Sequence, residues 1–192
     1  MTITEGRRHQ INARYDAVPR PTAETAPPRR TRTAQAYVWA AARIGLGWVF
    51  LWAFLDKLFG WGFATPAERA WINGGSPTTG FLKGTADKAL GDAFGTLAGQ
   101  GWVDWLFMTG LLGIGAALIL GAGMRIAAAA GGLLLVFMWA AELPLATNPF
   151  MDEHLVYAVV LAGLALAGAG DTLGLGGWWG RTAIVRRFPI LK

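Results

Sequence analysis

The chain contains no cysteine and only two histidines among its 192 residues. Without a thiol it cannot form a disulfide, use a cysteine nucleophile or build a thiolate metal site. His9 lies in an arginine-rich tail, which leaves His154 as the single histidine at membrane level and excludes paired histidine ligation of haem. One histidine among scattered acids is also a poor metal signal, so we expect neither a metal nor a haem. Any redox chemistry must be carried by a bound molecule.

Acidic residues are few as well, with 12 Asp and Glu against 17 Lys and Arg. The basic residues concentrate in the two tails, and no face between them combines basic and aromatic residues, so no nucleic-acid partner is predicted. Apolar residues are abundant: 54% of the chain is hydrophobic, it has 27 Gly and 10 Trp, and the mean hydropathy is +0.38. This composition predicts an integral membrane protein in contact with membrane lipid.

The sequence divides into three regions. Residues 1–35 carry arginines and prolines without apolar periodicity, which predicts a disordered basic tail. Residues 36–180 are expected to form an all-α membrane domain, a four-helix bundle, and residues 181–192 are expected to form a second basic tail. The four spans are expected at about 36–55, 103–120, 126–143 and 151–170. In the second span the small residues Thr109, Gly113, Ala117 and Gly121 recur every four positions, which predicts close helix packing there.

The polar segment of residues 60–101 is expected to carry short interfacial helices. Thr65 and Glu68 match a capping box with Pro66 at the first helical position, which predicts a helix over 66–73. A second cap at Thr85 precedes apolar residues at helical spacing and predicts a helix lying in the membrane interface.

Basic residues are distributed unequally between the two sides of the predicted bundle. The two tails and Arg125 share one side, whereas the other side balances lysines and arginines against acids. The positive-inside rule therefore predicts a multi-pass protein of the cell membrane with both termini in the cytoplasm.

A group of charged residues is expected at the outer end of the last two spans. Asn148 followed by Pro149 predicts the start of the fourth helix. A short link after the third span then brings Glu142 to the same end as Asp152, Glu153 and His154. The alternative for Asp152 and Glu153 is a purely structural role, because the helix dipole stabilises acids in the first turn of a helix.

Several of these motifs resemble the DoxX family. They are Arg43, Gly47 and Lys57 in the first span, the loop string Gly75–Gly80, and NPFMDEHLVYA from Asn148, followed by a Gly- and Ala-rich span and Trp178. Within the family the chain is similar to the DoxD type, the membrane large subunit of thiosulfate:quinone oxidoreductase, over about residues 36–179. The resemblance implies a four-helix membrane bundle, a quinone as cofactor, and electron transfer from thiosulfate to quinone with a second oxidoreductase subunit. It supplies no agreed catalytic set.

We therefore take candidate residues from their chemistry and position. His154 and Tyr157 share a helix face, and such donors at the edge of an apolar cavity can bond quinone carbonyls or relay a proton, although a partnered structural histidine is the alternative. Lys57 and Glu142 join His154 as candidate catalytic residues, with a structural salt bridge as the other interpretation of Lys57. Arg43 is a candidate for cofactor binding, or else extends to the cytoplasmic headgroups.

Two functions from different classes remain. One is a membrane subunit of a quinone-linked oxidoreductase, a thiosulfate dehydrogenase of the quinone type. The other is a non-catalytic membrane anchor or assembly partner for another protein. The sequence defines no oligomeric state.

Overall fold

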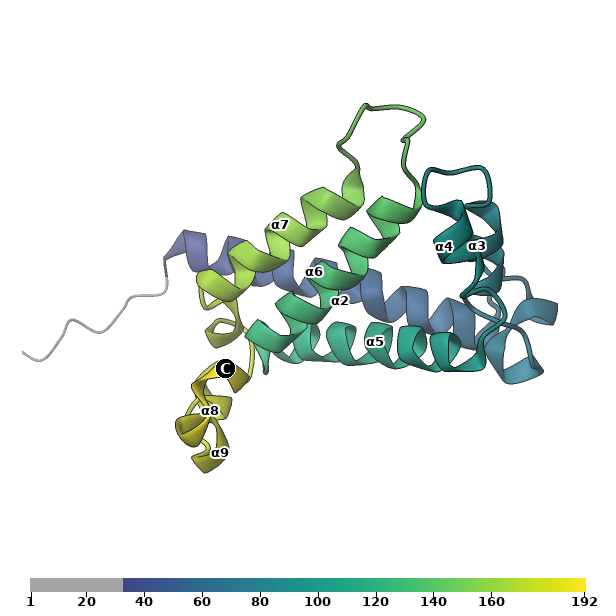
Figure 1. Ribbon diagram of the computed structural model, residues 1–192. Helices are drawn as coiled ribbons and strands as arrows, with labels where there is room; N and C mark the ends of the chain where they lie inside the picture. Colours follow the sequence, from purple (N-terminus) through teal and green to yellow (C-terminus); the bar gives the residue numbers. More distant parts are fainter. Residues whose placement is uncertain (1–32) are drawn as a thin grey trace, which may run out of the picture. The chain divides into compact units, whose positions relative to one another are not determined.

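The computed structural model describes residues 33–192, which are helical and contain no strand. Residues 1–32, and with them nearly all of the predicted disordered tail, lie outside the described residues. The four long helices are α2 (Ala34–Phe59), α5 (Gly101–Leu120), α6 (Met124–Ala141) and α7 (Glu153–Leu166), shown in Figure 1. The prediction of an all-α protein is confirmed for this part of the chain.

Three of these helices are long and apolar enough to cross a membrane: α2, α5 and α6, with 26, 20 and 18 residues. At about 1.5 Å per residue the shortest of them covers roughly 27 Å, close to the 30 Å of a bilayer's hydrocarbon core. Their positions match the first three predicted spans. These helices indicate a membrane protein.

The fourth helix differs from its prediction in both start and length. Asn148 does not cap it, because the Asn148 Oδ1 accepts hydrogen bonds from the amides of Phe150 and Met151 at 3.1 and 3.0 Å, forming a turn ahead of the helix. Asp152 is the N-cap, and its Oδ1 accepts from the Leu155 amide at 3.1 Å. With 14 residues, α7 is shorter than the predicted 20-residue span.

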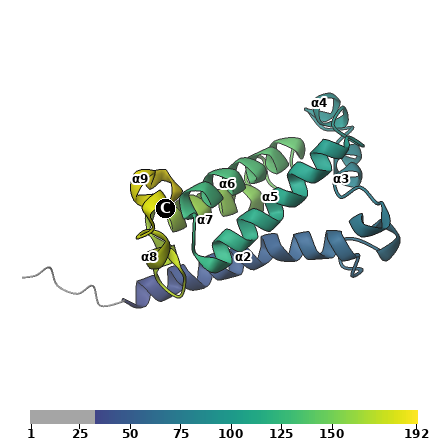
Figure 2. The same cartoon turned by 90° about the horizontal axis from the view of Figure 1, so that it is seen from below.

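Short elements lie at the two ends of the long helices (Figures 1 and 2). We call the end that carries the α2–α5 connection the loop end, and the end that carries the α5–α6 connection, residues 121–123, the turn end. The loop-end elements are η1 (Ala67–Arg69), η2 (Trp71–Asn73), α3 (Thr79–Gly84) and α4 (Gly91–Gly95). The turn-end elements that follow α7 are η3 (Ala169–Asp171), α8 (Gly176–Trp179), α9 (Ala183–Arg187) and η4 (Pro189–Leu191).

Three sequence predictions about the connections need correction. The expected helix over 66–73 is two 3-10 turns, and Thr65 makes no cap, since Pro66 is the N-cap position and no side-chain cap bond forms. Thr85 closes α3 instead of opening a long helix, because its hydroxyl donates to the Leu82 carbonyl at 2.8 Å. The link between α6 and α7 is residues 142–152, longer than the short turn expected there.

A close helix contact joins α2 to α5 through two glycines. A Cβ on Gly115 would lie 2.8 Å from the Leu51 amide nitrogen, and one on Gly47 would lie 2.9 Å from the Leu118 Cβ. Gly113, part of the predicted small-residue stripe, has nothing within 4 Å. The α2 and α5 backbones therefore approach at Gly115, two positions from Gly113, where a side chain would not fit.

Candidate functional site

A pocket of about 970 Å³ lies between α5, α6 and the loop-end elements, and we call it the α5/α6 pocket. Its volume is at the upper end of the range for small-molecule sites. Its walls are apolar side chains and glycine, namely Trp102, Val103, Leu106, Phe107, Gly110 and Ile114 of α5, and Ala130, Leu133, Leu134, Phe137 and Met138 of α6. From Trp102 to Ile114 the pocket follows α5 for about 18 Å, at 1.5 Å per residue.

The loop end of the pocket is polar. Two cations, Lys57 at the end of α2 and Arg69 in η1, line it together with the hydroxyl residues Thr65, Ser76, Thr78 and Thr79. An elongated apolar pocket with donors at one end suits an amphiphile with a polar head that accepts hydrogen bonds.

Lys57 has no ion pair or hydrogen bond among residues 33–192, because the neighbouring acid is occupied elsewhere. Asp56 is 2% exposed, and its carboxylate accepts from the amides of Phe63 at 3.3 Å and Ala64 at 3.0 Å. These bonds fold the chain back after α2. The ammonium of Lys57 therefore remains available to a ligand in the pocket.

A carboxylate fixes the polar wall of the pocket. Asp104, buried in the first turn of α5, accepts from the Ser76 hydroxyl at 2.9 Å, the Thr78 amide at 3.1 Å and the Thr78 hydroxyl at 2.6 Å. The Thr79 hydroxyl in turn lies 2.6 Å from that of Ser76 and accepts from the Gly99 amide at 3.0 Å. Residues 76–79 are thereby held against α5 at the pocket's polar end.

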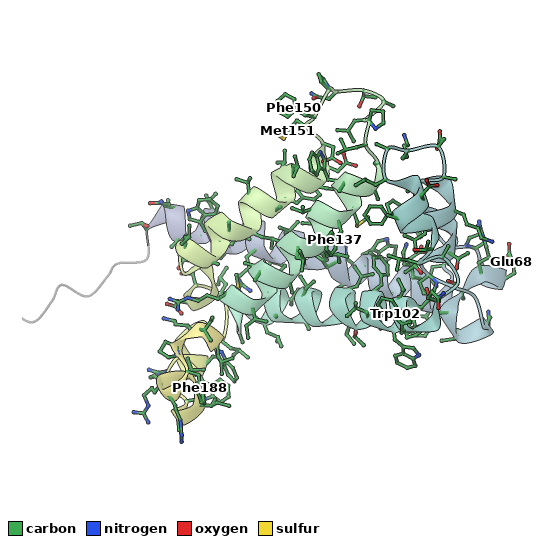
Figure 3. The ribbon with its side chains drawn as sticks, in the orientation of Figure 1. Glu68, Trp102, Phe137, Phe150, Met151 and Phe188 are labelled. Carbon is green, nitrogen blue, oxygen red and sulfur yellow. The ribbon has the colours of Figure 1, made fainter. Side chains whose placement is uncertain are left out.

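The pocket is open between the two long helices. Four of its wall residues are exposed large hydrophobics, Trp102 and Leu106 on α5 and Leu133 and Phe137 on α6. Trp102 and Phe137 are labelled in Figure 3, where they come from neighbouring helices. In a membrane-embedded chain this side of α5 and α6 faces lipid, so a lipid-soluble molecule can enter from the bilayer.

The candidate residues at the start of α7 form a small group of their own. His154 Nδ1 lies 2.7 Å from Asp152 Oδ2, and the two side chains are 13% and 11% exposed. Tyr157 packs against the hydrophobic core cluster, and its hydroxyl has no hydrogen bond among residues 33–192. Neither His154 nor Tyr157 lines the α5/α6 pocket.

The structure does not bring the remaining candidates together. Glu142 is the C-cap residue of α6 and forms no ion pair with Lys57 in the described residues. Arg43 is fully buried and donates to backbone carbonyls at the turn end, to Leu118, to Ile119 at 2.8 Å and to Leu173 at 2.8 Å. His154 lies at the start of α7, at the loop end, whereas Arg43 binds carbonyls at the turn end. Of the five candidates, only Lys57 lines the pocket.

Sequence reasoning missed Arg69 and the hydroxyl network around Asp104. The sequence does contain a signal for this network, because Asp104 is an acid at the start of an apolar span and residues Ser76–Thr79 include hydroxyl donors. What sequence alone does not give is the pairing of Asp104 with a loop that lies more than 20 positions earlier in the chain.

The fold and the pocket define a class, a helical membrane protein with an amphiphile-sized pocket that opens between two apolar helices. No metal cluster of three or more His, Asp or Glu side chains occurs in residues 33–192. Comparison with family models, curated proteins and solved structures finds no match to this chain.

Proposed function

We propose that the protein is the quinone-binding membrane subunit of an oxidoreductase, and that the quinone occupies the α5/α6 pocket. The observation that carries the proposal is the pocket itself, apolar along α5 and α6 and cationic at one end. A quinone has this polarity, with an isoprenoid tail and a head whose carbonyl oxygens accept hydrogen bonds. Lys57 is the donor best placed for the head, because its ammonium has no other partner in the described residues.

Positive charge at the head also suits reduction. A quinone that receives electrons becomes more negative until protons follow, and a neighbouring ammonium or guanidinium stabilises that charge in an apolar site. Lys57 and Arg69 supply two such charges. Thr78 and Thr79 line the same end of the pocket, where Asp104 accepts from the Thr78 hydroxyl at 2.6 Å.

The topology we propose is the four-span bundle of the DoxX type. In it α7 crosses the membrane together with the flanking turns, and the bilayer thins locally to match a helix of about 21 Å. The contacts of α7 support this arrangement, since Leu161 and Leu164 are buried against the other helices. Both termini are then on the same side.

The electron donor we propose is thiosulfate, as the DoxD resemblance implies. Two thiosulfate ions lose one electron each and join through a sulfur–sulfur bond, while the quinone takes up the two electrons and two protons to become quinol. A second subunit supplies the surface on which thiosulfate reacts. The membrane subunit contributes the quinone site and the access to it from the bilayer.

Quinone binding in the α5/α6 pocket can be tested by substitutions that fill the cavity with a larger side chain. Gly110 lines it and has open space where a Cβ would lie, so Gly110→Leu would project a side chain into the cavity. Gly113 lies on the same helix, also has open space, and does not line the pocket, which makes Gly113→Leu the matched control. We expect Gly110→Leu and Lys57→Met to lose co-purified quinone and thiosulfate-dependent quinone reduction in membranes, while Gly113→Leu and Lys88→Met retain both.

Two results would count against the proposal. Equal quinone content in the Gly110→Leu and Gly113→Leu variants would remove the pocket as the site. Bound quinone without any reduction by thiosulfate, in membranes that contain all native partners, would keep the site and remove the donor. Protein yield and thermal unfolding are measured for each variant, so that loss of folding is recognised.

A non-catalytic anchor or assembly partner is the second candidate, and an aromatic cluster at the loop end of α2 favours it. Trp52 contacts Trp48, Trp61 and Phe63 at ring-centroid distances of 5.7, 5.4 and 5.0 Å, and all but Trp52 are exposed. Such a group suits contact with another protein. If Trp61→Ala and Phe63→Ala release a co-purifying polypeptide while the pocket variants change no activity, the anchor function is correct.

A further inference from the structure

The residues after η3 form a compact unit of their own, residues 172–192, which we call the C-terminal platform. Val185 is its buried centre, and the Trp179 indole N–H donates to the Leu191 carbonyl at 2.7 Å. The Thr182 hydroxyl donates to the Trp179 carbonyl at 2.8 Å. These contacts fold α8, α9 and η4 onto one another.

The platform is fixed to the turn end of the membrane helices. The Leu175 amide donates to the Leu120 carbonyl at the end of α5, at 2.8 Å. Arg125 at the start of α6 binds the last residues of the platform. Its guanidinium donates to the Pro189 carbonyl at 3.0 Å, and its backbone amide donates to the Lys192 carbonyl at 3.4 Å. Since α5 ends and α6 begins at this level, the platform lies at the boundary of the bilayer.

The surface of the platform combines two kinds of side chain. Its exposed large apolar residues are Leu173, Leu175, Trp178, Ile184, Phe188 and Ile190, the last 68% exposed. Its basic residues are Arg181, Arg186, Arg187 and Lys192. Residues 172–192 contain no acid, but Lys192 pairs with Asp171 directly before them at 3.5 Å, so the three arginines are the charges the proposal uses. Ile184 and Phe188 are one helical turn apart, and the Arg187 guanidinium lies 5.6 Å from the centre of the Phe188 ring. Phe188 is labelled on this unit in Figure 3.

We propose that the C-terminal platform binds anionic lipid headgroups of the same membrane, with its apolar side chains inserted at the headgroup level and its arginines on the lipid phosphates. Exposed aromatic and aliphatic residues beside arginines are typical of surfaces that lie in the membrane interface. The position of the platform decides the occupant, because the ends of α5 and α6 hold it at the headgroup level, where anionic lipid is the abundant ligand. The proposal needs only that α2, α5 and α6 are embedded, and does not depend on the quinone site.

The first experiment measures lipid retention. The full-length protein and its Arg181→Gln, Arg186→Gln, Arg187→Gln triple variant are reconstituted in nanodiscs of mixed phosphatidylcholine and phosphatidylglycerol, and bound lipid is counted by native mass spectrometry. We expect affinity for phosphatidylglycerol to fall by about fivefold for each arginine removed. A control variant, Lys83→Gln, Lys88→Gln, removes charges at the loop end that lie outside the α5/α6 pocket and should retain wild-type affinity. Loss of affinity in the control that equals the loss per charge in the arginine variant, or no loss in the arginine variant, would overturn the proposal.

The second experiment locates the platform directly and uses the absence of cysteine. A nitroxide attached at Ile184→Cys should be reached by oxygen dissolved in the bilayer and be shielded from a water-soluble nickel reagent, whereas one at Lys88→Cys should show the reverse. The shielding should decrease in pure phosphatidylcholine and in the arginine variant. A water-exposed label at Ile184→Cys in anionic vesicles would refute lipid insertion. Dipolar coupling between labels on two molecules would assign the surface to self-association and would also refute it.

Discussion

Arg43 is a fully buried cation without a carboxylate partner in the described residues, and backbone carbonyls take that role. It donates to Leu118 and Ile119, whose carbonyls belong to the last turn of α5, and to Thr172 and Leu173 beyond η3. The last carbonyls of a helix have no partner within it and carry the negative end of its dipole, so a buried guanidinium stabilises them. One side chain of α2 thus joins α5 to the segment after α7.

Replacing this side chain should destabilise the protein strongly. Arg43→Met keeps apolar bulk but leaves buried carbonyls without donors, and a single such acceptor costs about 1–3 kcal/mol. We expect a lower midpoint of thermal unfolding in detergent, followed by circular dichroism. Arg125→Met, which removes an exposed arginine with one carbonyl contact, should change the midpoint far less. Equal unfolding midpoints for the two variants would show that Arg43 contributes no more to stability than Arg125.

Asp152 gives a prediction that depends on pH. Burial of its carboxyl favours the neutral form, but hydrogen bonds from His154 and the Leu155 amide outweigh this, and the pKa of Asp152 lies below its ordinary value of 3.8. A carboxyl with a lowered folded-state pKa stabilises the fold above its unfolded pKa, and this contribution is lost as pH falls through the folded pKa. Asp152→Asn keeps the N-cap but removes the charge.

We therefore expect wild type to be more stable than Asp152→Asn at pH 6, and the difference to disappear as the pH falls below 3.8. Hydrogen exchange of the Leu155 amide reports the N-terminus of α7 directly. Glu153→Gln removes an exposed acid from the first position of the same helix and is the control for a change of charge that leaves the N-cap in place. A difference that persists unchanged at acid pH would contradict the assignment.

At the scale of single elements, the approach of α2 to α5 can be tested with matched glycines. A Cβ on Gly115 would lie 2.8 Å from a backbone nitrogen of α2, whereas one on Gly113 meets nothing within 4 Å. Gly115→Ala should therefore force the helices apart at a cost of about 1–3 kcal/mol. Gly113→Ala should be neutral or slightly stabilising, because alanine favours a helix over glycine by about 0.5–1 kcal/mol.

Thermal unfolding and the yield of folded protein distinguish the two variants. The comparison is informative because both changes add one methyl group to the same helix. If Gly113→Ala proved the more damaging of the two, the packing of α2 on α5 described above would be wrong.

The elements that sequence predicted well are those defined by long apolar runs. The three longest helices were located within a few residues, because hydropathy over about 20 positions is a strong signal. Cap signals were less reliable. Asn148 and Thr65 have the residue types of N-caps, yet one forms a turn before α7 and the other makes no cap bond, since the same side chains stabilise turns equally well.

The candidate site was predicted less well for a different reason. Lys57 was predicted to join Glu142 and His154, and the structure places it instead in the α5/α6 pocket, which neither of them lines. The residues that surround it in the pocket come from the α2–α5 connection and from two other helices. Their proximity follows from how the connection folds back, which depends on the bonds of Asp56 and Asp104 to distant backbone and hydroxyl groups. No local pattern records those pairings.

At the scale of the whole molecule, the two ends of the helices differ in charge. The turn end carries Arg125, the platform arginines and one acid, Asp171, whereas the other eight acids of residues 33–192 lie at the loop end. From the positive-inside rule we predict that the turn end is cytoplasmic and that the loop end faces outward. Because the platform is bonded to the ends of α5 and α6, the C-terminus should share the side of residues 121–123 even though α7 is short.

Cysteine labelling in intact cells tests this orientation without background, since the native chain has no thiol. We expect Lys88→Cys and Thr147→Cys, both at the loop end, to react with a maleimide that cannot cross the membrane. Gly123→Cys and Lys192→Cys, at the turn end, should react only after the cells are permeabilised. Labelling of Lys192→Cys but not Gly123→Cys in intact cells would place the C-terminus across the membrane from the α5–α6 turn, which the bonds between Arg125 and residues 189–192 do not allow. Complete reversal of all four sites would keep the fold and invert its orientation, and the polar end of the α5/α6 pocket would then face the cytoplasm.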